Sequence, residues 1–124
     1  MMNILFVLLG GSLGAVCRYG LGVAGTRLYG EAFPWGTLCV NLVGCFLVGF
    51  AFALGAERNM LSPSFRLFFV TGFLGALTTF SAYALESANF TRDGLHMATI
   101  WNLLANNVGG LALVFVGMRV GHLL

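Results

Sequence analysis

The sequence predicts an all-α integral membrane protein with four transmembrane helices. Of its 124 residues, 59% are hydrophobic and only 8% are charged, whereas about a quarter of the residues in a typical soluble domain are charged. A helix needs about 20 mostly apolar residues to cross a bilayer, so this length allows about four spans with short connections. We therefore expect a single membrane domain over residues 1–124 and no additional soluble domain.

The first two helices are expected near residues 3–25 and 35–56. No basic leader precedes the first apolar run and no small-residue cleavage pattern follows it, so we expect a retained helix and not a signal peptide. Gly10 and Gly14 lie four residues apart on one face of this helix. Small residues at this spacing allow the backbone of another helix to approach closely.

The last two helices are expected near residues 66–88 and 97–120. The segment 72–86 places two glycines, two threonines and a serine in the middle of the third span. Glycine weakens a helix, and hydroxyl side chains compete for its backbone groups. The pattern predicts an interruption near 75–79, and the residues alone favour a kink over a complete break. Carbonyl groups freed by a break could bind a cation, as they do in transporters.

The two halves of the chain resemble each other. GGSLGA at 10–15 is similar to TGFLGA at 71–76, and VNLVG at 40–44 is similar to ANNVG at 105–109. A repeated pair of helices keeps its orientation in the membrane, so this similarity predicts a parallel repeat. Chance similarity between glycine-rich apolar segments is the alternative.

All basic residues are arginines, and they are divided evenly between the two sides of the membrane. Arg27 and Arg92, with Arg18 deeper in the first span, flank one side, and the other side has Arg58, Arg66 and Arg119. The positive-inside bias is therefore close to zero, which would allow insertion in both orientations and pairing as an antiparallel dimer. Insertion decided by features other than charge is the alternative. The chain has no basic patch, which argues against nucleic acid as a partner.

The sequence contains none of the HExxH, GxSxG, paired CxxC or phosphate-loop motifs, so we expect no enzyme activity. Its polar residues within the spans are costly to bury and call for hydrogen-bond partners or a wet pathway. Thr37 and Asn41 are four residues apart on the second helix, and Asn102 and Asn106 correspond to them in the repeat. Their hydrogens could face an anion without supplying a fixed charge. Hydrogen bonding that only joins the helices is an equally good interpretation.

Phe80 and Tyr83, three residues apart, share a face of the third helix. Such a pair is usually core packing, but the positive edges of the two rings could also face a dehydrated anion. The hydroxyl groups of Thr79 and Ser81 lie beside this pair in the sequence, and we include them among the candidate pathway residues.

Arg18 and Glu86 are ionisable residues about one or two turns from the ends of the first and third helices. Both could extend their charged groups to the interface. They could instead pair with each other, or Arg18 could mark an anion vestibule.

Three motifs resemble the Fluc (CrcB) fluoride channels over essentially the whole chain: GGxxGAxxRY at 10–19, GTLxVNxxGxFxxG at 36–49 and GFxGxxTTFSxYxxE at 72–86. The resemblance implies a passive, fluoride-selective channel that lowers cytoplasmic fluoride, placed in the bacterial cytoplasmic (inner) membrane. It also implies a dual-topology homodimer with two antiparallel pores and a broken third helix. Fluoride, a second copy of the chain and membrane lipid are the implied partners.

The resemblance also implies roles for particular residues. Backbone carbonyls of Gly75 and Thr78 would hold a structural Na⁺ at the dimer interface. Tyr83 departs from the family pattern, which commonly has Phe at this position, and its hydroxyl adds a donor at the pore wall. The implied fluoride pathway comprises Phe80, Tyr83, Asn41 and Thr37, with Asn106 and Asn102 assigned by looser alignment.

Two other functions are compatible with a small four-helix membrane protein. A proton-coupled multidrug exporter would need a carboxylate deep in the membrane, but the first span has none and Glu86 lies near a helix end. A structural assembly subunit would use its polar residues only to join helices, and it would tolerate apolar replacement of Phe80 and Asn41.

Overall fold

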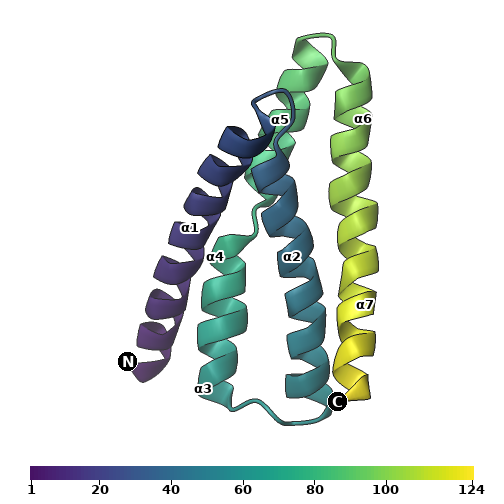
Figure 1. The fold of residues 1–124 in the computed structure, drawn as a ribbon. Helices are drawn as coiled ribbons and strands as arrows, with labels where there is room; N and C mark the ends of the chain where they lie inside the picture. The colour runs from purple at the N-terminus through teal and green to yellow at the C-terminus, as the bar shows by residue number, and fades with distance from the viewer.

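The computed structural model describes residues 1–124, and all of its regular structure is helical (Figure 1). The first two helices are α1, Met2–Tyr29, and α2, Trp35–Phe52, which continues as the π-helical turn η1, Ala53–Glu57. The remaining elements are α3, Pro63–Arg66; η2, Leu67–Leu74; α4, Gly75–Leu77; α5, Phe80–Arg92; α6, His96–Leu104; η3, Ala105–Gly109; and α7, Gly110–Leu123.

These elements combine into four helices that are long and apolar enough to cross a membrane, which confirms the expected four-helix architecture. The expected boundaries differ from the observed ones by a few residues. The third helix begins at Pro63 and not near residue 66, because the Ser62 side chain accepts a hydrogen bond from the Phe65 amide and proline suits the first helical position. The four spanning helices are Met2–Tyr29, Trp35–Glu57, Pro63–Arg92 and His96–Leu123.

The third helix is interrupted at Thr78 and Thr79. Both residues are extended, with φ and ψ of −79° and 155° at Thr78 and of −150° and 117° at Thr79. Gly72 and Gly75, in contrast, remain helical. The interruption is therefore a complete break and not the kink that the residues alone favoured. The Thr79 hydroxyl accepts a hydrogen bond of 3.2 Å from the Ala82 amide and so caps the new helix α5.

Glycines let α1 pack directly against η2. A Cβ atom added at Gly10 would overlap the Phe68 carbonyl oxygen, and one added at Gly14 would overlap the Phe73 carbonyl oxygen. Gly72 faces α1 in return, since its Cβ would lie 2.8 Å from the Val7 oxygen. The close approach expected from the glycine spacing is confirmed, and its partner is the segment that resembles it in the repeat.

We expect Gly10→Ala to weaken the folded protein clearly, because the new methyl group meets backbone that cannot move aside. The cost should be of the order of 1–3 kcal/mol, the usual range for overpacking. Gly11→Ala is the matched control, since its Cβ would lie 4.0 Å from the nearest backbone oxygen. Thermal unfolding in detergent measures both variants, and equal melting temperatures would contradict this packing.

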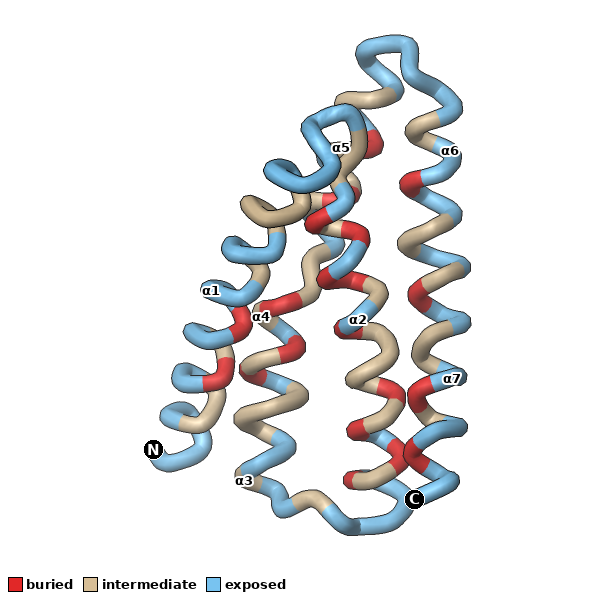
Figure 2. Tube along the Cα trace, in the orientation of Figure 1, coloured by how far each residue is buried: buried red, intermediate tan, exposed pale blue.

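Burial is confined to the faces where the helices meet (Figure 2). Only 20 of the 124 residues are buried, and large apolar side chains cover the outside of the bundle. Asn102, however, is completely buried. The interior of this chain therefore contains amide groups while its exterior is apolar, as is appropriate for a protein surrounded by lipid.

Candidate functional site

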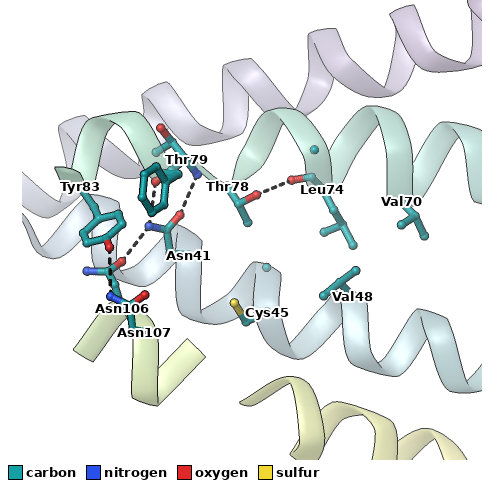
Figure 3. Close-up of a pocket in the computed structure, with 13 residues that line it drawn as sticks. Asn41, Cys45, Val48, Val70, Leu74, Thr78, Thr79, Tyr83, Asn106 and Asn107 are labelled. Atoms are coloured by element: carbon teal, nitrogen blue, oxygen red, sulfur yellow. Dashed lines mark hydrogen bonds between the residues drawn. The ribbon is translucent and has the colours of Figure 1, made fainter. Parts of the chain in front are cut away.

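A cavity of about 360 Å³ lies at the break in the third helix, between α2 and η3 (Figure 3). Side chains from all three parts of the chain line it, and none of them carries a formal charge. Its polar lining residues are Asn41, Thr78, Thr79, Tyr83, Asn106 and Asn107. The cavity thus presents polar groups at membrane depth in a neutral wall.

Asn41 takes over the backbone hydrogen bonds that the break removes. Its Nδ2 donates to the Thr79 carbonyl oxygen at 3.0 Å, and its Oδ1 accepts from the Thr79 amide at 2.8 Å. An unpaired backbone group in the membrane interior would cost several kcal/mol. This side chain on α2 therefore stabilises the extended backbone of the break.

Three asparagines form a continuous chain of amide hydrogen bonds. Asn41 Nδ2 donates to Asn106 Oδ1 at 2.8 Å, and Asn106 Nδ2 donates to the carbonyl oxygen and Oδ1 of Asn102 at 2.9 and 3.0 Å. Asn102 Nδ2 then donates to Ser87 Oγ at 3.0 Å and to the Tyr83 carbonyl oxygen at 3.4 Å. Asn41 and Asn106, which correspond in the proposed repeat, are thus directly bonded.

Phe80 and Tyr83 begin α5 and form an edge-to-face pair. Their ring centroids are 5.1 Å apart and their planes meet at 83°. Tyr83 is buried, whereas Phe80 is 73% exposed in the single chain. Both rings line the cavity. The structure therefore places the predicted aromatic pair beside Asn41. Much of the Phe80 ring lies on the surface of the chain, where lipid or another protein chain could contact it.

The sequence interpretation did not include Asn107. This residue lines the cavity, and its Nδ2 donates to the Tyr83 hydroxyl at 3.0 Å and to the Leu103 carbonyl oxygen at 2.9 Å. Neighbouring residues of a regular α-helix point about 100° apart, so a regular helix would direct only one of Asn106 and Asn107 into the cavity. The π-helical turn η3 contains both residues and widens the helix there.

Thr37 and Glu86 lie outside the cavity and bond to each other. The Thr37 hydroxyl donates to Glu86 Oε1 at 2.6 Å, and Glu86 Oε2 is buried without a partner. The close contacts between acidic and basic side chains join Arg92 to Asp93 and Glu57 to His122. Arg18 and Glu86 therefore do not pair with each other within one chain.

Two other candidate residues are placed around the edge of the site. Ser81 is exposed at the start of α5, with its Oγ 3.4 Å from Thr79 Oγ1. Asn102 lies behind Asn106, and its side chain is bonded only to protein groups. Thr79 itself lines the cavity.

Gly75 and Thr78, the residues implied for a cation, also line the cavity. In an uninterrupted helix the Thr79 amide would bond to the Gly75 carbonyl oxygen, but here it donates to Asn41. Thr78 has an extended backbone, so its carbonyl group no longer points along the helix axis. Uncharged backbone oxygens released by a broken helix are suitable ligands for Na⁺, and these residues fit that ion.

Comparison with known proteins matches residues 5–118 to the family described as CrcB-like protein, Camphor Resistance (CrcB). A protein of Salinibacter ruber named fluoride-specific ion channel FluC is 49% identical over 117 residues, which cover 94% of this chain and 87% of that protein. Proteins with the same name from Legionella pneumophila (strain Lens) and Agrobacterium fabrum are 48% and 44% identical. These alignments cover 94% and 98% of this chain, and 87% and 98% of the respective relatives.

These matches extend over nearly the whole chain and include all four helices. They confirm the resemblance that the three motifs indicated. Relatives of this kind are ion channels and not enzymes, in agreement with the lack of a catalytic motif. The chain is a multi-pass membrane protein that belongs to the CrcB family.

Proposed function

We propose that this protein is a fluoride-selective channel that lets fluoride leave the cell passively and so lowers cytoplasmic fluoride. The observation that carries this proposal is the uncharged, largely apolar cavity at the break, into which amide, hydroxyl and aromatic groups project. The names of the relatives support the choice of ion. The proposed site of action is the bacterial inner membrane.

The cavity suits an anion that has lost its water. Hydroxyl hydrogens and aromatic ring edges can stabilise negative charge, and a wall without cations does not trap it. Phe80 and Tyr83 present their rings next to Asn41, while Thr79 adds a hydroxyl. We propose these four residues and Asn106 as the centre of the pathway.

The outer parts of the pathway are proposed from position alone. Thr37 and Asn102 lie one helical turn before Asn41 and Asn106, and they extend the same polar faces towards the helix ends. Ser81 lies beside Thr79 at the start of α5. Arg18 is proposed for an anion vestibule on the basis of its charge and its place within the first span.

We propose that two copies pair in antiparallel orientation and form two pores. Phe80 lines the cavity but is mostly exposed in one chain, which suggests that a second copy completes the wall. The even division of arginines between the two ends of the bundle supports insertion in both directions. Accessibility of a terminal tag from both sides of the membrane tests this, and labelling from one side only would contradict dual topology.

A structural Na⁺ at the dimer interface is the proposed cofactor, held by the carbonyls of Gly75 and Thr78. We expect replacement of Na⁺ by a large organic cation to weaken fluoride flux, because the ion would join the two broken helices. The measurement compares fluoride efflux from liposomes prepared in each cation at equal ionic strength. Equal flux in both cations would contradict the Na⁺ site.

The decisive test of function is efflux from liposomes that contain the purified protein. A fluoride electrode should record rapid electrogenic efflux when a potassium ionophore balances the charge. Chloride measured in the same way should remain trapped. The proposal is wrong if fluoride is released no faster than from protein-free liposomes.

A further inference from the structure

The amide side chains of the site already use all their hydrogens within the protein. Each Nδ2 group of Asn41, Asn106, Asn102 and Asn107 donates to two protein acceptors. An amide nitrogen carries only two hydrogens. None of these four groups can therefore donate to an ion unless it first breaks a bond to the protein.

The orientations of these amides are fixed by the backbone. Each Nδ2 contacts a carbonyl oxygen, which can only accept: that of Thr79, Asn102, Tyr83 or Leu103. Rotating an amide by 180° would place oxygen against oxygen. The hydrogen assignments therefore follow from the geometry.

The Tyr83 hydroxyl differs from the amides, since it accepts from Asn107 at 3.0 Å and donates to no protein group. A phenol that accepts one hydrogen bond still has its own hydrogen to give. Among the other hydroxyls, that of Thr78 gives its hydrogen to the Leu74 carbonyl. The Thr79 hydroxyl accepts from the Ala82 amide and lies 3.4 Å from Ser81 Oγ, a contact in which either oxygen could donate, so it has a protein acceptor within reach whereas Tyr83 has none. The Cys45 thiol is only a weak donor.

We infer that the Tyr83 hydroxyl, held in place by Asn107, is the donor that this channel offers to fluoride at the break. This inference rests on the proposed fluoride function. Tyr83 is 6% exposed and lines the cavity, so its hydroxyl is shielded from bulk water. A hydrogen bond to an anion is stronger in such a shielded place than in water. Asn107 acts as a positioning residue, because one of its hydrogens goes to the Tyr83 hydroxyl (Figure 3) and the other goes to the Leu103 carbonyl oxygen.

Tyr83→Phe removes the donor and keeps the ring. We expect the fluoride concentration at half-maximal flux to rise about tenfold to a hundredfold, the range for losing one hydrogen bond to a charged group. Tyr29→Phe is the matched control, since this tyrosine is 68% exposed and does not line the cavity. Flux is measured in liposomes over a range of fluoride concentrations.

Asn107→Leu tests the positioning role without removing the hydroxyl. It should weaken fluoride flux in the parent protein but have no further effect in a Tyr83→Phe background, because its role depends on that hydroxyl. If the losses of flux caused by Asn107→Leu and by Tyr83→Phe add up in the double variant, Asn107 has a structural role only, and this part of the inference is overturned. Size-exclusion chromatography shows whether each variant assembles as the parent does.

The outcomes separate this inference from the proposed function. If the parent conducts fluoride and Tyr83→Phe has the same half-maximal concentration, the hydroxyl is not the donor and the channel proposal stands. If the parent does not conduct fluoride, both are wrong. If Tyr83→Phe fails to assemble, unchanged flux in Asn107→Leu overturns the inference by itself.

Discussion

Phe80→Ile should reduce fluoride flux to the level of protein-free liposomes. Isoleucine is also apolar, but it lacks the positive ring edge that Phe80 would present to a dehydrated anion beside the break. The change also removes the edge-to-face contact with Tyr83, worth about 0.5–1.5 kcal/mol, which is too little to unfold the chain. The measurement is fluoride efflux from liposomes with protein content matched to the parent.

Phe115→Ile is the matched control for this loss. Phe115 is also largely exposed, at 62%, but lies on α7 and does not line the cavity. It should conduct as the parent does, and both variants should elute as the parent does in size-exclusion chromatography. Normal conduction by Phe80→Ile would show that the assignment of the aromatic pair is wrong.

Asn41→Leu should abolish flux and also destabilise the protein. Leucine leaves three partly buried polar groups without this partner: the amide and the carbonyl of Thr79, and Oδ1 of Asn106. Each such group costs about 1–3 kcal/mol, so the free energy of unfolding should fall by at least about 3 kcal/mol. Thermal unfolding in detergent measures the stability, and liposome efflux measures the function.

Asn3→Leu makes the same chemical change at an exposed position near the start of α1. It should leave both the melting temperature and the flux unchanged. If Asn41→Leu matched Asn3→Leu in stability, Asn41 would not stabilise the extended backbone at Thr79. If it lost stability but kept full flux, Asn41 would have a structural role only.

The sequence predicted the four helices well, because a long apolar run between charged links can cross a membrane only as a helix that satisfies its own backbone hydrogen bonds. It also predicted that another helix would approach Gly10 and Gly14 closely, but the structure was needed to show that this helix is the third one. It did not predict the true nature of the break. The residues placed an interruption near 75–79, where the structure has it, but they favoured a kink over a complete break. Gly72 and Gly75 remain helical, and the extended residues are Thr78 and Thr79.

The position of the break depends on Asn41, a residue 38 positions from Thr79 in the sequence. Its side chain compensates for the lost helical hydrogen bonds, and local propensity contains no information about such a partner. Asn107 was missed for a related reason, because the π-helical turn η3 changes which neighbouring residues share a face. The fluoride pathway residues themselves stay a prediction.

The break has a final consequence for electrostatics. A helix carries partial positive charge at its N-terminus and partial negative charge at its C-terminus, about half an elementary charge each. Two extended residues therefore create one end of each sign in mid-membrane, the negative end at Leu77 and the positive end at Phe80. A single chain interruption can thus attract a cation and an anion to adjoining places without placing any ionised side chain in the cavity.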